Sequence, residues 1–154
     1  MPSPTADLEQ SALKLLARRE HSQRELINKL KKKAFTLDQI KSLLESLKEE
    51  GLQSDQRFAE AFTKERIRMG YGPRVISMAL QERGVTEALI DDSISVYSDV
   101  FWEEQLEALW RRRFGNKPYD KDLAEKARQY RFLSYRGFDS HQIYTLLKRF
   151  FHED

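Results

Sequence analysis

The sequence predicts an all-α protein, arranged as an elongated tandem array of three three-helix units with about nine helices. Apolar residues recur at helical spacing along most of the 154-residue chain, and no stretch alternates apolar and polar residues long enough to indicate a strand. A turn of Gly or Ala followed by an apolar and a polar residue occurs three times, beginning at Ala34, Gly84 and Gly137. The period of about fifty residues is typical of helical arrays.

These three turns align with their surroundings. Each follows a leucine and precedes an isoleucine and a second aliphatic residue at constant offsets: Leu30, Leu80 and Leu133; Ile40, Ile90 and Ile143; and Leu44, Ile94 and Leu147. In unrelated amphipathic helices, Leu and Ile can align by chance. Here the turn residue aligns as well, which favours a true repeat. We expect a flexible N-terminal tail over residues 1–5 and units over 6–51, 52–98 and 99–154.

In the first unit, the apolar spacing predicts helices over residues 6–19, from about 23 to 33, and from about 37 to 50. Thr5 is a candidate cap of the first helix. Ser22 and Glu25 form a capping box at the start of the second helix, and Gly51 ends the third.

The second unit begins near Leu52, with Ser54 or Asp55 as a helix cap. Gly70 and Gly72 suit a turn with positive φ, and Pro73 suits the first position of the next helix. Gly84 then closes that helix, and a further helix follows over about 87–97. We expect Gly72, Pro73, Gly84 and Gly137 to shape the turns.

In the third unit, Ser98 and Asp99 mark a break. Apolar residues from Phe101 to Phe114 predict one helix, and residues 115–118 predict a turn because they combine Gly, Asn and Pro. Helices over about 120–136 and 140–151 complete the chain.

Composition limits the class of protein. The absence of cysteine excludes disulfides and thiol catalysis. No apolar run approaches the roughly 20 residues of a membrane span, and the N-terminus lacks the pattern of a signal peptide. We therefore expect a cytoplasmic protein that makes no membrane contact. Charged residues make up 34% of the chain, which suits a large surface relative to the core.

Catalytic signatures are weak, and no catalytic residue, metal site or cofactor is predicted. The three histidines lie far apart in the sequence, without metal-ligand spacing. Gly70 and Gly72 resemble the start of a dinucleotide fingerprint, but the third glycine and the preceding strand are missing. Adjacent acidic pairs such as Asp91 and Asp92 point in different directions on a helix. The chain is predicted not to be an enzyme.

Charge is segregated along the sequence. Between Gly84 and Trp110 there are seven acidic residues and no Lys or Arg, whereas basic residues gather before and after this stretch. Such segregation suits a polyanion or a protein of complementary charge; cations that complement helix dipoles explain part of it. Aromatic residues among the cations suit base stacking or partner pockets, although core burial accounts for most aromatics.

The chain resembles the RecX family, the bacterial regulators of the RecA recombinase. The resemblance spans almost the whole chain and rests on four sets of residues: Arg19–Ser22 with Glu25, Leu26, Lys29 and Leu30; Leu52 to Ala59; Gly70–Pro73 with Ile76, Leu80 and Arg83–Val85; and Phe132–Phe138 with Ile143. One departure is a single acidic residue, Asp55, after Ser54, where the family often has two acidic residues together. That position is a candidate cap and not a catalytic group.

The resemblance implies a protein that binds the RecA filament on single-stranded DNA and inhibits its ATPase, strand-exchange and coprotease activities. It would block filament extension or promote disassembly, and so modulate recombinational repair and the SOS response. We expect a monomer, with weak direct contact to single- or double-stranded DNA. The predicted contact residues are Arg24, Lys29, Arg66, Arg68, Tyr71, Arg74, Arg83, Arg131, Tyr135 and Arg136.

Two other functions stay open. A stand-alone helical DNA-binding module would bind DNA alone with a steep salt dependence. An adaptor between other proteins would depend on neither DNA nor filament. The tandem array predicts a radius of gyration above the roughly 15 Å of a compact chain of this length, which solution scattering measures.

Overall fold

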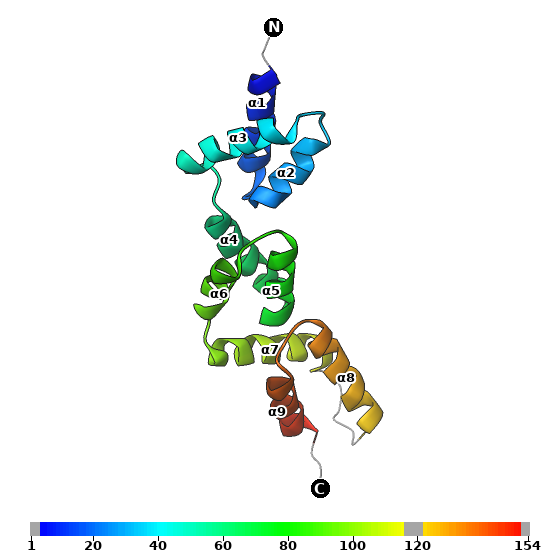
Figure 1. The fold of residues 1–154 in the computed structure, drawn as a ribbon. Helices are drawn as coiled ribbons and strands as arrows, with labels where there is room; N and C mark the ends of the chain where they lie inside the picture. Colours follow the sequence, from blue (N-terminus) through cyan, green and yellow to red (C-terminus); the bar gives the residue numbers. More distant parts are fainter. Residues whose placement is uncertain (1–3, 116–121, 152–154) are drawn as a thin grey trace. The chain divides into compact units, whose positions relative to one another are not determined.

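The structure is a computed structural model that describes residues 4–115 and 122–151. Every regular element within these residues is an α-helix (Figure 1), as predicted. The nine helices are α1 (Pro4–Arg18), α2 (Gln23–Lys31), α3 (Leu37–Glu49), α4 (Asp55–Arg68), α5 (Pro73–Glu82), α6 (Glu87–Ser95), α7 (Asp99–Phe114), α8 (Leu123–Tyr135) and α9 (Ser140–Phe150). None of the described helices is both long and apolar enough to cross a membrane.

Several helix ends differ from the sequence prediction, and three of them are informative. Helix α1 begins at Pro4, so Thr5 lies within the helix and does not cap it; proline is well tolerated in the first turn. Helix α6 ends at Ser95, where the Tyr97 N–H donates to the Ile94 carbonyl at 3.1 Å in a tight final turn. Helix α8 is capped by Asp122, and most of the turn predicted for 115–118 lies outside the described residues.

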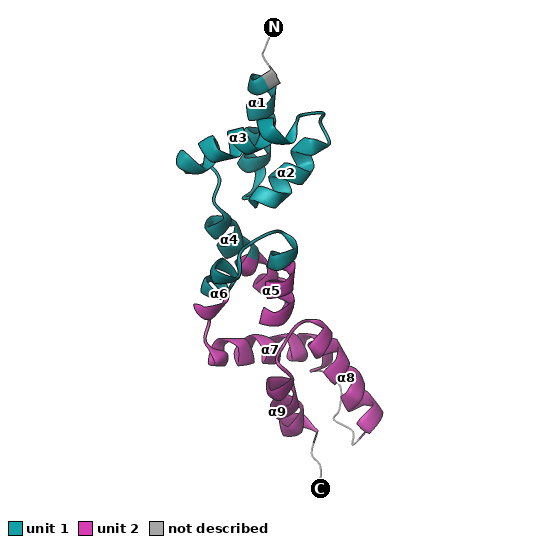
Figure 2. Ribbon diagram, in the orientation of Figure 1, with its two compact units in different colours: residues 1–62, 80–93 teal, residues 63–79, 94–154 magenta. Residues whose placement is uncertain are grey.

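The chain divides into two compact units (Figure 2). Compact unit 1 contains residues 1–62 and 80–93, and compact unit 2 contains residues 63–79 and 94–154. Helices α4, α5 and α6 each contribute residues to both compact units. This division follows compactness, so it does not coincide with the three sequence repeats.

The core of compact unit 1 comes from the apolar faces of its first three helices. Seven side chains that are at most 3% exposed form it: Leu8, Ala12, Leu26, Leu30, Ile40, Leu44 and Leu47. Leu15, Leu16 and Leu43 pack against this core while remaining partly exposed. The amphipathic stripes predicted for α1, α2 and α3 therefore face one another, which stabilises helices that are too short to persist alone in water.

Helix α7 supplies most of the large core residues of compact unit 2. Trp102, Leu106 and Trp110 are at most 4% exposed. The Trp110 indole N–H donates to Gln129 Oε1 at 2.8 Å, and its ring stacks on Phe150 with centroids 4.3 Å apart. The buried N–H therefore has a partner, as a buried tryptophan requires.

The repeated turns have the same backbone conformation. The φ values of Ala34, Gly84 and Gly137 are 66°, 80° and 100°, and the leucines four residues before them are fully buried. Each turn also places a cap on the next helix: the side chains of Thr36, Thr86 and Asp139 accept hydrogen bonds from the backbone N–H three residues later, at 3.2, 3.5 and 3.0 Å. The repeat found in the sequence is thus a repeated turn and cap.

Candidate partner-binding surfaces

Half of the predicted contact residues lie at two places that we call the first and second junctions. The first junction consists of Ser22, Arg24 and Glu25 on α2 with Glu82, Arg83 and Gly84 at the turn after α5, all within compact unit 1. The second consists of Tyr71, Gly72 and Arg74 around the start of α5 with Ser134, Arg136 and Gly137 at the turn after α8, all within compact unit 2.

Ser22 anchors the first junction. It is fully buried, and its hydroxyl accepts from the Glu25 N–H at 3.1 Å while donating to the Arg83 carbonyl at 2.8 Å. The Glu25 side chain in turn accepts from the Ser22 N–H at 3.1 Å. The predicted capping box is confirmed, and its serine also satisfies a carbonyl at the end of another helix.

Arg24 and Gly84 approach closely at the same junction. Arg24 Nη1 donates to the Glu82 carbonyl at 3.4 Å. A Cβ atom on Gly84 would lie 2.8 Å from Arg24 Nε. Glycine at this position therefore meets two needs, since it adopts positive φ and leaves room for the arginine.

Glu25 connects three elements of compact unit 1. Its carboxylate pairs with Arg19 at 3.0 Å and with Arg83 at 3.8 Å. Burial opposes ionisation, but the hydrogen bonds from Arg19 and the Ser22 N–H prevail and lower the pKa of Glu25. Arg83 also lies over the Phe62 ring, 4.7 Å from its centroid. The Arg83 guanidinium therefore already has an anionic and an aromatic neighbour.

A buried histidine lies beside the first junction. His21 is 1% exposed; its Nε2 lies 2.9 Å from Lys29 Nζ and its Nδ1 lies 3.1 Å from the Arg19 carbonyl. Because an ammonium only donates, Nε2 accepts and Nδ1 carries the proton. Burial lowers the pKa of His21, and the charges of Arg19 and Lys29 act in the same direction. Burial also lowers the pKa of Lys29, together with Arg19.

Residues at the start of α4 form hydrogen bonds with His21 and with the start of α2. The Gln23 N–H donates to Asp55 Oδ1 at 2.9 Å, and Gln53 Nε2 donates to the His21 carbonyl at 3.2 Å. Asp55 is the acidic residue that follows Ser54. Its carboxylate satisfies a free N–H at the start of α2, which is a structural role.

Backbone hydrogen bonds form the second junction. The Gly72 N–H donates to the Arg136 carbonyl at 2.8 Å, and the Arg74 N–H donates to the Gly137 carbonyl at 3.1 Å. A Cβ atom on Gly72 would lie 2.6 Å from the Gly137 carbonyl carbon. Gly70 has the predicted positive φ, but Gly72 does not. Gly72 is needed for close approach of two backbones, so the conformational role predicted for it is wrong.

Aromatic and cationic side chains cover the second junction. Arg136 lies 4.9 Å from the Tyr71 ring centroid and 5.2 Å from that of Phe132, while its Nη1 donates to the Met69 carbonyl at 3.1 Å. Arg66 also lies over the Tyr71 ring, 5.8 Å from its centroid. The fold thus brings together three residues that the sequence predicted separately, namely Arg66, Tyr71 and Arg136.

The two junctions are built by equivalent residues. Arg24 precedes Ala34 by ten residues, and Arg74 precedes Gly84 by ten residues. Each guanidinium donates to a carbonyl at the end of another helix, Arg24 to Glu82 and Arg74 to Ser134. The residues before Gly84 and Gly137 both offer their carbonyl to the start of the opposing helix. The chain therefore uses one turn-to-helix contact twice.

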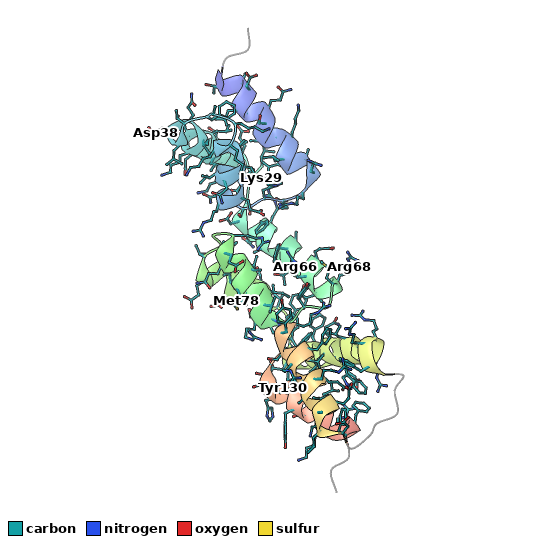
Figure 3. All side chains as sticks on the ribbon, turned by 90° about the vertical axis from the view of Figure 1, so that its right-hand side faces the viewer. Lys29, Asp38, Arg66, Arg68, Met78 and Tyr130 are labelled. Atoms are coloured by element: carbon teal, nitrogen blue, oxygen red, sulfur yellow. The ribbon has the colours of Figure 1, made fainter. Side chains whose placement is uncertain are left out.

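The remaining predicted residues lie apart from the junctions. Arg68, on α4, forms a two-pronged ion pair with Glu65 at 3.1 and 2.5 Å; Figure 3 marks it together with Arg66 and Lys29. Arg131 is exposed on α8, and Tyr135 at the end of that helix is 82% exposed. Both side chains are accessible to a partner.

The prediction missed residues whose role depends on neighbours far along the chain. Lys126 and Tyr130 on α8 and Tyr144 on α9 line a groove of about 330 Å³, although no motif distinguishes them in the sequence. In the sequence, Lys126 is one of the clustered cations and Tyr130 one of the aromatic residues among them, but neither belongs to the predicted contact set; their spacing places them one turn apart on one helical face. No cluster of three or more potential metal ligands occurs among the described residues.

Comparison with known proteins also gives three three-helix domains in order along the chain. Family models described as the first, second and third three-helix domains of RecX match residues 10–47, 54–94 and 102–147. Regulatory protein RecX of Pseudomonas fluorescens (strain SBW25) is 44% identical over 138 residues, which is 89% of this chain and 87% of that protein. Regulatory protein RecX of Pseudomonas syringae pv. tomato is 40% identical over 148 residues, or 96% and 93% of the two chains.

Solved structures share the fold. The crystal structure of RecX from Lactobacillus salivarius aligns with a TM-score of 0.78 at 21% identity and covers 95% of this chain and 96% of that one. A second crystal structure of regulatory protein RecX aligns with a TM-score of 0.75 at 23% identity, covering 94% and 73%. With three domain matches in order and more than 40% identity to a curated relative, the chain belongs to the RecX family of regulatory proteins.

Proposed function

We propose that this protein regulates the RecA recombinase by binding its filament on single-stranded DNA. Binding would inhibit ATP hydrolysis, strand exchange and coprotease activity, either by blocking filament extension or by promoting disassembly. It would thereby restrain recombinational repair and the SOS response. The observation that carries this proposal is the ordered match of all three RecX domains over residues 10–147.

The contact surface proposed for the filament includes Arg131 and Tyr135. Both are exposed on one helix, one turn apart, where a cation and an aromatic ring face the same side. Arg66, Tyr71 and Arg136 form a second candidate surface at the second junction. Such paired cations and aromatics suit either a nucleic acid or a protein partner.

The other predicted cations have contacts within the chain. Arg24 and Arg74 donate to helix-end carbonyls, Arg83 pairs with Glu25, and Lys29 donates to His21. We propose that these four residues support binding chiefly by holding the junctions. Arg68 is paired with Glu65 but exposed, so it remains a candidate for direct contact.

The test compares binding to bare single-stranded DNA with binding to the same DNA coated with recombinase and nucleotide. We expect tighter binding to the coated strand and loss of ATPase activity at substoichiometric protein. Replacing Arg131 with Gln and Tyr135 with Ala together should weaken binding to the coated strand by about tenfold, or 1.4 kcal/mol. Arg128→Gln is the matched control, because Arg128 lies on the same helix but pairs with Glu125 at 2.6 Å.

The competing function is a stand-alone DNA-binding module, which the exposed Tyr135 ring and its neighbouring cation also suit. It predicts equal or stronger binding to bare DNA, with ATPase lost only as recombinase is displaced. That outcome would contradict the regulatory proposal and leave the family assignment as a statement about fold.

A further inference from the structure

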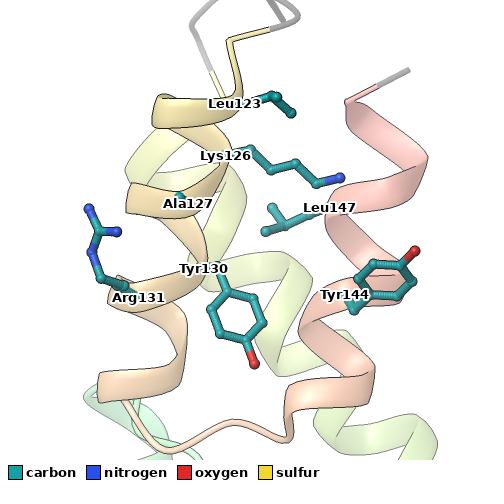
Figure 4. Close-up of a pocket in the computed structure, with 7 residues that line it drawn as sticks. All are labelled: Leu123, Lys126, Ala127, Tyr130, Arg131, Tyr144 and Leu147. Atoms are coloured by element: carbon teal, nitrogen blue, oxygen red, sulfur yellow. The ribbon is translucent and has the colours of Figure 1, made fainter. Parts of the chain in front are cut away.

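The groove between α8 and α9 has no role in the function proposed above. It encloses about 330 Å³ and is lined by Leu123, Lys126, Ala127, Tyr130, Arg131, Tyr144 and Leu147 (Figure 4). All of these residues belong to compact unit 2. The volume is near the lower end of the roughly 300–1,000 Å³ of ligand pockets, which suits anchoring side chains of a larger partner.

Apolar groups form most of the groove. Leu123, at the start of α8, is 70% exposed, and Tyr144 on α9 is 51% exposed, whereas Leu147 beneath them is buried. Tyr130 projects from α8 toward the gap between the helices (Figure 4). Two large side chains therefore expose apolar surface beside a buried leucine, an arrangement that gains free energy when a partner covers it.

Two cations lie beside Tyr144 at the α9 side of the groove. Lys126 Nζ lies 5.8 Å from the Tyr144 ring centroid, and Lys148 Nζ lies 6.0 Å from it. The described lining residues include no carboxylate. Arg131 lines the groove through its stem while its guanidinium points away from α9 (Figure 4). The cations beside Tyr144 are therefore Lys126, which lines the groove, and Lys148, which lies next to it.

We propose that the groove between α8 and α9 binds an acidic peptide segment that carries an aliphatic or aromatic anchor. The anchor covers the exposed surface of Leu123 beside Tyr130, while carboxylates of the peptide pair with Lys126 and Lys148. Helix-in-groove recognition uses an apolar floor and acidic-motif recognition uses clustered cations, and this groove offers both features.

A nucleic acid fits this surface less well. Both ammonium groups lie over the Tyr144 ring, so a base that stacked on it would have to displace a cation already placed there. A carboxylate instead approaches the ammonium groups while the ring stays covered. The inference goes beyond the proposed function, and its test uses the isolated chain without recombinase, so the two fail independently.

The test uses synthetic fluorescent peptides and the full-length chain. The first peptide carries Glu and Asp on one helical face and Leu and Phe on the other. A second replaces the acids with Lys, and a third replaces the apolar anchors with Ser. We expect only the first to bind unmodified protein, with amide chemical-shift changes concentrated in α8 and α9.

Charge reversal identifies the contact. Lys126→Glu with Lys148→Glu should weaken binding of the acidic peptide at least tenfold and create binding of the lysine peptide. Lys14→Glu is the matched control, because Lys14 lines an open groove on α1 that also contains Leu13 and Glu9. Circular dichroism verifies that each variant is folded.

Three results would overturn the proposal. The first is equal weakening by Lys14→Glu, which would mean that only net charge matters. The second is equal binding of the serine peptide, which would remove the apolar anchor. The third is an oligothymidine that displaces the acidic peptide and loses affinity on the same Lys126 and Lys148 substitutions, which would assign the groove to nucleic acid.

Discussion

Ala34 occupies a backbone conformation that its two equivalents fill with glycine. Its φ is 66°, and no other non-glycine residue in the described part of the chain has a positive φ. The left-handed conformation costs a residue with a Cβ atom roughly 1–2 kcal/mol. The first repeat therefore keeps the turn without the residue best suited to it, which identifies a position where stability can be gained.

Replacing Ala34 with Gly should raise the free energy of unfolding by about 0.5–1 kcal/mol, since relief of strain exceeds the added entropy of glycine in the unfolded chain. Thermal or urea unfolding measures the change. Ala61→Gly, in the interior of α4, is the control and should lose about 1 kcal/mol. A destabilised Ala34→Gly variant would show that the turn is not strained.

His21 makes stability depend on pH. Its pKa is lowered in the folded state by burial and by Arg19 and Lys29, against the opposing influence of the Arg19 carbonyl and Glu25. The unfolded chain therefore binds more protons, and the stability that neutral His21 permits is complete above pH 6.5 and is lost as pH falls toward the lowered pKa.

We expect the free energy of unfolding to decline as the pH falls below about 6.5, and His21→Gln to flatten this decline. Chemical denaturation at a series of pH values measures both. His141→Gln is the matched control, because it removes an exposed imidazole from α9. An unchanged pH profile in His21→Gln would rule out the histidine as the titrating group.

At the scale of elements, the two junctions hold helix starts against helix ends. Hydrogen-bond donors at the starts of α2 and α5 meet carbonyls at the ends of α5 and α8, groups that a helix leaves without internal partners. The glycines at these turns are required for packing as well as for φ. Two pairs of substitutions test this description. The first distinguishes the stability from a helix cap from that of the junction hydrogen bond, and the second distinguishes backbone strain from steric overlap at a close approach.

Ser22→Ala should lower the free energy of unfolding by about 2–3 kcal/mol, because it removes both a helix cap and the buried hydrogen bond to the Arg83 carbonyl. Ser98→Ala is the control, since Ser98 caps α7 at an exposed position and should cost about 1 kcal/mol. Equal losses in the two variants would mean that the junction bond adds no stability.

Gly137→Ala should be more destabilising than Gly51→Ala. Both glycines have positive φ, which accounts for roughly 1–2 kcal/mol in each variant. A Cβ atom on Gly137 would lie 2.6 Å from the Val75 backbone nitrogen, whereas one on Gly51 meets nothing within 4 Å. We expect Gly137→Ala to lose at least about 2 kcal/mol more of the free energy of unfolding than Gly51→Ala, because the added Cβ atom overpacks the second junction. Urea unfolding of the two variants measures this difference.

At the scale of the whole molecule, cations that hold junctions differ from cations that meet a partner. We expect Arg131→Gln to reduce the slope of log affinity for single-stranded DNA against log salt concentration by about 0.7, the contribution of one phosphate contact. Arg24→Gln should lower stability while leaving that slope unchanged, because its guanidinium donates to the Glu82 carbonyl. A reduced slope in Arg24→Gln would return Arg24 to the contact surface.

Much of the fold was predictable because its signals are local. Apolar spacing identifies the helices, Ser22 with Glu25 identifies a capping box, and the aligned turns identify the repeat; each depends on residues within one or two helical turns. The elongation of the array, the boundaries between its units and the monomeric state stay predictions.

The candidate site was less predictable. Arg24, Arg74 and Arg136 read as surface cations in the sequence, but in the structure each donates to a carbonyl of a distant segment. The groove lined by Lys126, Tyr130 and Tyr144 has no sequence motif, since two helices must pack before it exists. Local periodicity thus determined the helices and turns of this protein, and the resemblance of its residue motifs indicated the family. Only the tertiary structure decided which cations hold the chain together, because hydrogen-bond partners fifty or more residues apart leave no local pattern.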